Sequence, residues 1–393
     1  MKRLLFVTSR FPYPPVGGDR LRAFHLERLL ARHYEVEVLS LGPEPVDEAT
    51  LEAFRAASGV KVASAIDQPL WRSLTGAAAA LLAGQPLQVG YFRNPHLERA
   101  FGRALPQADV VLLHLIRASA LWQRQRRVPA MLDMCDAISE NLQQAARNGR
   151  WWSPWTWVCR LEAPRLQRFE RTQAQAFDLV SLVAAADRDV LGLKEPQAFV
   201  LTQGVDLQHY PYVPPQQRSG NAIALIGKMD TYPNRSAALW AARELMPLLP
   251  QFRLKVVGDC TAALRDRLQA LPGVQVTGRV ASIAEACSDC FASVAPLDVA
   301  TGIQNKVLES FALGLPMVLS KSAARGLLPA SAGAYLTAQT PRQWADAVLL
   351  LHSRGDEILR MAHQARAYVE QHHTWDAVGD ELYARLERLQ KPS

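Results

Sequence analysis

The segment Thr301-Gly302-Ile303-Gln304-Asn305-Lys306-Val307-Leu308-Glu309 continues into Ser310-Phe311-Ala312-Leu313-Gly314-Leu315-Pro316. It follows the apolar run Ala292–Leu297, so the pattern predicts a strand, a short loop and a helix that opens near Gln304 and stops at Gly314. The first turn of such a helix presents free N–H groups and a partial positive charge, which favour a bound phosphate. Lys306 adds a full charge there, and Glu309, about one and a half turns in, is spaced to accept hydrogen bonds from hydroxyls attached to that phosphate. These features indicate a nucleotide site, and an ordinary capped βα unit is the alternative.

The rest of the chain alternates short apolar runs with longer helical patterns, which predicts parallel sheets covered on both faces. A first set of predicted strands covers 3–8, 36–41, 60–64, 109–114, 129–134, 179–183 and 198–202, with helices at 20–33 and 164–177. A second set of strands covers 221–227, 253–257, 274–277, 293–297 and 316–320, separated by helices at 236–249, 262–271, 283–290 and 304–313.

This repetition predicts an α/β protein with two Rossmann-like α/β/α domains that face each other across a cleft. We expect an N-terminal domain at 1–210, a proline-containing linker at 211–220 and a C-terminal domain at 221–373. The segment 374–393 has apolar residues at helical spacing, and we expect it to pack back on the N-terminal domain. A ligand of such a pair binds at the carboxyl ends of the strands.

Composition limits the function. At 393 residues, with 49% apolar and 21% charged residues, the chain is globular and long enough for two cores. Its net charge of +7 favours anionic ligands or an anionic membrane surface, while no nucleic-acid-binding motif is apparent. The apolar tract 76–84 is too short to span a bilayer, so we expect a cytoplasmic protein. The five scattered cysteines include one Cys-x-x-Cys, Cys287 and Cys290, for which helix packing is the default interpretation over metal binding.

Four segments in this order resemble the GT-B glycosyltransferases of family 4, which are mostly retaining and use nucleotide-sugar donors. They are Pro14-Pro15-Val16-Gly17-Gly18, Gly204-Val205-Asp206, Gly227-Lys228 and the segment from Gly302 to Pro316. The Gly-Ile-Gln-Asn-Lys motif resembles the sequence of a subgroup that builds bacterial exopolysaccharides, including exosortase-associated sugar transferases. The resemblance covers essentially the whole chain.

The sequence departs from that family at two positions. The family usually carries two glutamates eight positions apart; the second is Glu309, but the first falls on Thr301, so Thr301 or Asp298 is left to contact the donor sugar. Relatives also place two basic residues, five positions apart, on the pyrophosphate. Here Lys228 fills the first place and Pro233 the second, which leaves Asn234 or Lys306 to compensate.

The resemblance assigns roles to individual residues. It implies catalytic roles for His114 beside the transferred sugar, Lys228 at the diphosphate and Glu309 at the ribose. Donor contacts are expected from Gly17, Gly18, Lys228, Val280, Gly302, Ile303, Gln304, Lys306 and Glu309. No protein nucleophile is required, and no Asp-x-Asp pair is placed to hold a metal between the phosphates, so we expect neither a metal nor another cofactor.

Acceptor contacts are expected in the N-terminal half. Arg117 is a candidate for an anionic group, and Asp133 and Asp136 follow a predicted strand, although Asp136 equally suits a helix cap. Four tryptophans lie between Trp151 and Trp157 beside arginines, and Trp151 and Trp152 suit either an acceptor-stacking wall or a membrane interface.

Together these features predict a glycosyltransferase that moves a sugar from a UDP-, GDP- or dTDP-linked donor to a glycan or lipid-linked acceptor in bacterial surface polysaccharide synthesis. Peripheral contact with the inner face of the cytoplasmic membrane is part of this prediction. A catalytically silent GT-B partner of another transferase and, less favoured, a sugar-nucleotide epimerase are the alternatives.

Overall fold

The computed structural model describes residues 1–42, 45–123, 128–149, 151–353 and 355–390. The chain divides into two compact units. The first comprises Met1–Thr202 together with Asp376–Ser393, and the second comprises Gln203–Trp375. The expected linker at 211–220 lies inside the second unit, and the last three residues of the expected C-terminal segment lie outside the described part of the chain.

The first unit contains a parallel seven-stranded sheet with the order β3-β2-β1-β4-β5-β6-β7. The strand order reverses between β1 and β4, so the side chains that follow these two strands meet at the carboxyl edge of the sheet. The strands are β1 (Arg3–Thr8), β2 (Glu35–Gly42), β3 (Val62–Asp67), β4 (Val110–His114), β5 (Ala130–Cys135), β6 (Leu179–Leu182) and β7 (Ala198–Val200).

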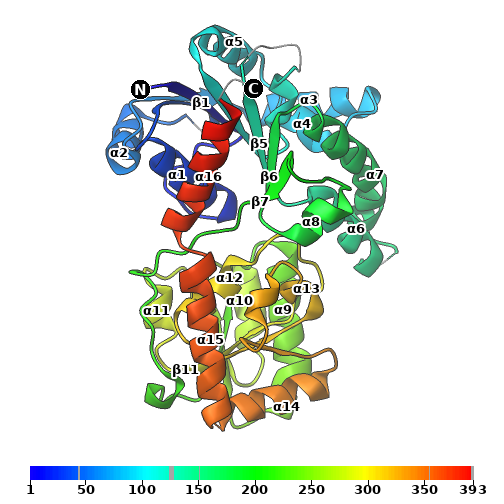
Figure 1. Ribbon diagram of the computed structural model, residues 1–393. Coiled ribbons are helices and arrows are strands. Elements are labelled where there is room, and N and C mark those ends of the chain that lie inside the picture. Colours follow the sequence, from blue (N-terminus) through cyan, green and yellow to red (C-terminus); the bar gives the residue numbers. More distant parts are fainter. Residues whose placement is uncertain (43–44, 124–127, 150, 354, 391–393) are drawn as a thin grey trace. The chain divides into compact units, whose positions relative to one another are not determined.

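Helices cover this sheet, whose central strands β4 and β5 are fully buried, as expected for a parallel sheet (Figure 1). They are α1 (Gly18–Leu30), α2 (Glu48–Ser58), α3 (Leu70–Leu82), α4 (Leu87–Tyr91), α5 (Pro95–Ala104), α6 (Ile138–Asn148), α7 (Pro154–Ala174), α8 (Ala185–Val190) and α16 (Trp375–Leu389).

The C-terminal helix α16 packs beside α1 (Figure 1). Tyr383 stacks on His33 with ring centroids 4.0 Å apart, and the Arg385 guanidinium lies 4.6 Å from the ring of Phe199. A Cβ on Gly379 would approach Leu29 to 2.9 Å, so the missing side chain lets the two helices come close.

The second unit contains a parallel six-stranded sheet with the order β10-β9-β8-β11-β12-β13. Here the strand order reverses between β8 and β11. The strands are β8 (Ala222–Ile226), β9 (Arg253–Val257), β10 (Val274–Gly278), β11 (Cys290–Ala295), β12 (Met317–Leu319) and β13 (Leu336–Thr337). The helices are α9 (Tyr232–Trp240), continued by a π-helical turn at Ala241–Leu245, then α10 (Ala262–Gln269), α11 (Ile283–Ala286), α12 (Asn305–Ala312), α13 (Lys321–Ala324), α14 (Pro341–His352) and α15 (Asp356–His372).

The structure corrects two predicted helices. The helix expected at 164–177 begins ten residues earlier, at Pro154, and contains Pro164 in its interior, so a proline that suits a first turn was mistaken for the start. The helix expected at 283–290 ends at Ala286, because Cys290 begins β11 and pairs with β8. Cys287 and Cys290 therefore do not share a helix, and both are buried in an apolar cluster.

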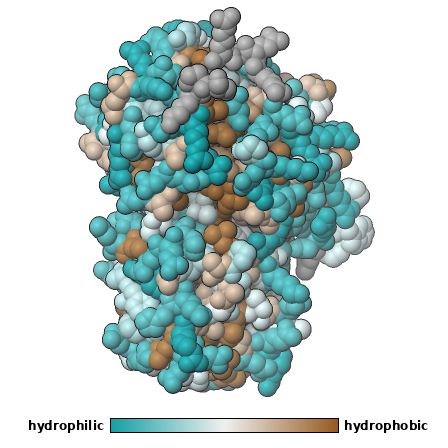
Figure 2. Space-filling view, viewed as in Figure 1, coloured by the Kyte–Doolittle hydropathy of each residue, from teal (hydrophilic) through white to brown (hydrophobic). Residues whose placement is uncertain are grey.

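None of the helices in the described ranges is long and apolar enough to cross a bilayer. The face seen in Figure 2 is mostly hydrophilic, with smaller apolar areas between the polar side chains. Scattered apolar side chains of this kind are normal on a protein surface.

Candidate functional site

In the second unit, the candidate site lies at the switch point between β8 and β11. Gly227 follows β8 with φ at 150°, and Gly258 follows β9 with φ at 134°. A Cβ on Gly258 would lie 2.1 Å from the Gly227 carbonyl oxygen, so these two turns can only come together without that side chain. The loop after β11 leads to Gln304, the N-cap of α12, and Gly314 ends the helix with φ at 72°.

Four side chains form what we call the donor cluster: Tyr210, Asn234, Lys306 and Glu309. The Lys306 ammonium donates to the Asn234 Oδ1 atom, and the Asn234 amide donates to the Lys228 carbonyl oxygen at 2.9 Å. The Tyr210 hydroxyl donates to the Glu309 carboxylate. Two of the four lie on α12, Lys306 in its first turn and Glu309 in its second turn.

The charges of Lys306 and Glu309 are partly removed from water. Burial lowers the pKa of Lys306 to about 8, although Glu309 opposes the shift. Burial raises the pKa of Glu309, and the Tyr210 hydroxyl and the charge of Lys306 partly offset that rise. A cation in the first turn of a helix also conflicts with the helix dipole. An anion bound at the start of α12 would relieve both penalties on Lys306.

The other expected donor residues lie around this cluster. Lys228 is exposed and pairs with Asp230 at 3.0 Å. Gly302 has φ at 61°, and a Cβ on Gly326 would meet its carbonyl oxygen at 1.8 Å. Ile303 is buried, and the Gln304 amide donates to the Thr301 carbonyl oxygen at 2.8 Å. The Val280 side chain packs against the apolar cluster that includes residues of β8.

The two candidates for the place of the missing glutamate differ in exposure. Thr301 is 5% exposed, whereas Asp298 approaches the Ser236 hydroxyl on α9 at 3.4 Å in an exposed setting. Asp298 is therefore the more accessible of the two.

In the first unit, the carboxyl ends of β1 and β4 carry the expected residues. Gly17 is the N-cap of α1 with φ at 97° and is exposed, and Gly18 is the first helical residue. The Asp19 carboxylate pairs with Arg10 at 3.0 Å. Burial alone would raise the pKa of Asp19, but the charges of Arg10, Arg117 and His114 outweigh it and lower the value.

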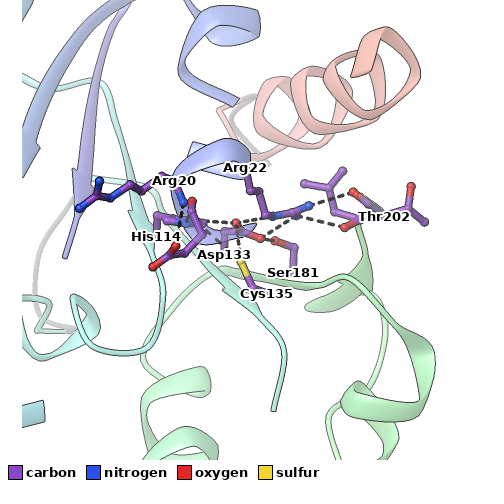
Figure 3. A network of polar contacts seen from close by, with 9 residues as sticks. Arg20, Arg22, His114, Asp133, Cys135, Ser181 and Thr202 are labelled. Carbon is purple, nitrogen blue, oxygen red and sulfur yellow. Dashed lines mark hydrogen bonds and ion pairs between the residues drawn. The ribbon is translucent and has the colours of Figure 1, made fainter. Parts of the chain in front are cut away.

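His114 and Asp133 belong to a buried network (Figure 3). The His114 Nδ1 atom lies 2.8 Å from Asp133 Oδ2, and its Nε2 atom lies 3.2 Å from the Asp19 carbonyl oxygen. Arg22 donates to both Asp133 oxygens at 2.8 and 2.9 Å, and the Ser181 hydroxyl donates to Oδ1 at 2.7 Å. Burial opposes the charge on Asp133, but Arg22 and His114 hold its pKa well below the usual range.

Three side chains of this network are of types that can bind a metal ion. His114, Asp133 and Cys135 are close enough to share a metal ion. Both carboxylate oxygens, however, are already bonded to the Arg22 guanidinium, and burial together with the Asp133 charge raises the pKa of the Cys135 thiol, which disfavours the thiolate a metal needs. The residues do not fit a metal. The Asp-x-Asp pair Asp187 and Asp189 on α8 is split as well, because Asp187 is buried and Asp189 pairs with Arg188 at 3.1 Å.

The acceptor candidates have different surroundings. The Arg117 side chain donates to Gln88 at 3.2 Å, and its guanidinium lies 4.9 Å from the Phe92 ring. Asp136 lies between β5 and α6, and Ala137 rather than Asp136 is the N-cap of that helix. Trp151 and Trp152 are 68% and 61% exposed, with their rings 5.6 Å apart in an edge contact.

The sequence reasoning missed Arg22, Ser181 and Tyr210. Arg22 lies within the helical pattern of α1, and Ser181 lies in the middle of β6, so neither carries a local signal. Tyr210 stands at the edge of a proline-containing segment that was interpreted as a linker. Only the fold brings these side chains to Asp133 and Glu309.

One family model and several solved structures match this chain. A family model described as glycosyl transferases group 1 matches residues 220–354, from just before β8 to just after α14. No curated protein matches the sequence. Among solved structures, Anabaena HepE in complex with UDP and glucose is 14% identical, with a TM-score of 0.68, covering 99% of this chain and 100% of that chain.

The fold is GT-B. Sucrose-phosphate synthase from Thermosynechococcus elongatus has a TM-score of 0.71 at 14% identity, with 99% of each chain covered. The lipopolysaccharide outer core galactosyltransferase WaaB, in its apo form, has a TM-score of 0.61 at 10% identity, covering 98% of this chain and 99% of that one. The family match over the second unit, taken with this fold, supports a GT-B glycosyltransferase.

Proposed function

We propose that the protein is a retaining glycosyltransferase of family 4 that moves a sugar from a nucleoside-diphosphate donor to a glycan or lipid-linked acceptor in bacterial surface polysaccharide synthesis. The observation that carries this proposal is the donor cluster at the start of α12, where Lys306 and Glu309 are partly buried on the helix that the sequence marked as a nucleotide site. HepE, whose fold is similar, is described in complexes with UDP and with UDP-glucose, which supports a UDP-linked donor.

In this proposal the leaving diphosphate binds the N-terminal end of α12. Lys306 and the free N–H groups of the first helical turn offset the charge that grows on the phosphate as the glycosidic bond breaks. Glu309 accepts hydrogen bonds from the ribose hydroxyls, with Tyr210 fixing the carboxylate, and the backbone at Val280 borders the base. Lys228 adds an exposed charge at the second phosphate.

The sugar transfer itself needs no protein nucleophile. The bond from the anomeric carbon to the leaving phosphate oxygen breaks, the acceptor oxygen bonds to that carbon on the same face, and the acceptor proton moves to the phosphate oxygen. We propose that His114, which Asp133 holds by a hydrogen bond, contacts the transferred sugar. We propose that this chemistry proceeds without a metal, so turnover persists in EDTA.

Replacing Glu309 by glutamine tests the proposal. The change keeps the size of the side chain but removes the charge that strengthens its hydrogen bonds, so we expect nucleoside-diphosphate affinity to fall by about tenfold to a hundredfold. Thermal stabilisation by a panel of UDP-, GDP- and dTDP-sugars measures this affinity, and slow release of nucleoside diphosphate measures turnover.

The matched control for that experiment is Glu357→Gln, a change of an exposed glutamate on α15 of the same unit. The control should behave as the wild type. If none of the donors stabilises the wild-type chain, the transferase proposal fails. Donor binding without any release of nucleoside diphosphate would favour the silent-partner alternative.

We also propose that the first unit contacts the inner face of the cytoplasmic membrane. Trp151, Trp152, Trp155 and Trp157 are each more than half exposed, and α3 adds exposed apolar side chains at Leu70, Trp71, Leu74, Leu81 and Leu82. The sequence contains no Asp or Glu in 68–97 or 141–161 but contains five arginines there. Exposed tryptophans among arginines suit an anionic lipid surface.

For this contact we expect the triple change of Trp151, Trp152 and Trp155 to serine to reduce sedimentation with anionic liposomes by about tenfold or more. The control replaces Leu349 and Leu350, exposed residues of α14, by serine and should bind as the wild type does. Equal sedimentation of the triple variant and the wild type would remove the membrane contact from the proposal.

A further inference from the structure

The first unit contains a cavity of about 240 Å³ near the carboxyl ends of β1 and β2. Ser9 reaches it from the end of β1, and Arg117 reaches it from the loop after β4. Residues on or next to helices α4, α5 and α7 supply other parts of the wall, which include Phe92, Phe169 and Gln173. This volume is below that of pockets for drug-sized molecules and suits a ligand of about one sugar ring.

Three polar atoms around this cavity are buried without a hydrogen-bond partner in the described part of the chain: Ser9 Oγ, Arg117 Nη1 and Gln173 Oε1. Buried polar atoms are nearly always hydrogen-bonded, so three unpaired atoms around one space point to a bound polar group. They supply a hydroxyl, a cationic donor and an amide acceptor. Such a set matches a ligand that has both an anionic group and hydroxyls.

Arg117 is fixed in this position before any ligand binds. Its Nε atom donates to the Gln88 side chain at 3.2 Å, and its guanidinium lies 4.9 Å from the Phe92 ring. Burial lowers the pKa of Arg117, the charge of Arg10 lowers it further, and the charges of Asp19 and Asp136 offset part of the shift. Asp19 itself is paired with Arg10 at 3.0 Å, so the charge of Arg117 has no direct partner among the ion pairs of the described residues.

The net charge of the side chains that line the cavity favours a carboxylate over a phosphate. Three charged side chains line the cavity: Arg93, Glu98 and Arg117. Arg93 and Glu98 neutralise each other at 2.9 Å, which leaves one positive charge. One positive charge balances a carboxylate, whereas a phosphate dianion would leave a buried negative charge beside Glu98 and the Gln173 oxygen.

We propose that this cavity binds an acidic sugar unit of the acceptor, with its carboxylate on Arg117 and its hydroxyls on Ser9 and Gln173. The aromatic rings of Phe92 and Phe169 pack against the apolar face of the sugar. The assignment of this sugar to the acceptor rests on the proposed transferase function, whereas the binding of a sugar carboxylate does not.

Binding of free glucuronate to the full chain, without a nucleotide, tests the cavity directly. We expect glucuronate to bind by calorimetry or ligand-observed NMR, and glucose and inorganic phosphate to bind at least about tenfold more weakly. Arg117→Gln should weaken glucuronate binding by about tenfold or more, while Arg103→Gln, a change of an exposed arginine on α5, should have no effect. If the Arg117→Gln variant does not fold, Ser9→Ala is the second variant. It removes only the Ser9 hydroxyl oxygen and should also weaken glucuronate binding.

The outcomes separate this inference from the proposed function. Glucuronate that fails to bind at millimolar concentration, glucose that binds equally well, tighter binding of phosphate, or unchanged binding in both variants would each overturn the carboxylate site. UDP-sugar stabilisation of the same variants is measured in parallel and should equal that of the wild type. A wild-type chain that binds no nucleotide sugar would instead overturn the transferase proposal, and glucuronate binding would still support the carboxylate site.

Discussion

Replacing Arg22 by methionine is expected to destabilise the first unit by about 3–5 kcal/mol. Arg22 and Asp133 are both fully buried, and the guanidinium also donates to the carbonyl oxygens of Leu201 and Thr202 at 3.0 and 2.9 Å. The change leaves the Asp133 charge without its main partner in a dry site. Urea unfolding of the full chain, followed by a probe in each unit, measures the loss.

The sign of the pH dependence follows from the lowered pKa of Asp133. The stabilisation from this carboxylate is fully present above its unfolded pKa of about 3.9 and is lost as the pH falls toward the lower folded value. The Arg22→Met variant should show much less of this acid dependence. A double change, Arg22→Met with Asp133→Leu, should recover most of the loss, and single variants within about 1 kcal/mol of the wild type would contradict the network's structural role.

Replacing Lys306 by alanine is expected to lower turnover by about a hundredfold. The side chain is the partly buried cation at the start of α12, so its removal takes away charge where the leaving diphosphate is proposed to bind. The steady-state rate of nucleoside-diphosphate release measures the effect. Lys321→Ala, a change of an exposed lysine on α13, is the control and should keep the wild-type rate.

The pKa of Lys306, about 8 before a ligand binds, adds a second readout. A bound diphosphate favours the charged lysine and raises this pKa, so binding near pH 8 should take up a proton, and affinity should fall as the pH rises above 8. Calorimetry in buffers of different ionisation enthalpy detects the proton. Lys306→Arg keeps its charge and should show no uptake, and buffer-independent heats for the wild type would contradict the assignment.

Local sequence pattern predicted most of the two sheets. The apolar runs bounded by turns placed β1, β4 and β8 to within one residue, because a parallel strand buried on both faces has a continuous apolar signature. The two-residue strand β13 was missed, since a pair of residues carries no pattern. Helices α2 to α6 were also not predicted. The start of α7 was predicted wrongly because a proline inside a helix is unfavourable, and packing within the unit offsets the free-energy cost of Pro164.

The residues of the candidate sites also fall into two groups, those that the sequence predicts and those that only the fold brings together. Lys306 and Glu309 could be chosen from sequence because three positions on one helix fix their relation. Arg22 and Asp133 are 111 positions apart, and no local pattern relates them. The polar lining of the first unit's cavity combines the ends of two strands with α7, so Ser9 and Gln173 were invisible before the fold was known.

A crystal structure of the full chain grown with UDP tests the donor cluster most directly. We expect the diphosphate within hydrogen-bond distance of Lys306 Nζ and of the N–H groups in the first turn of α12, with the ribose hydroxyls on Glu309. UDP bound elsewhere, with Lys306 still on Asn234 and Glu309 contacting only Tyr210, would contradict the proposed donor site.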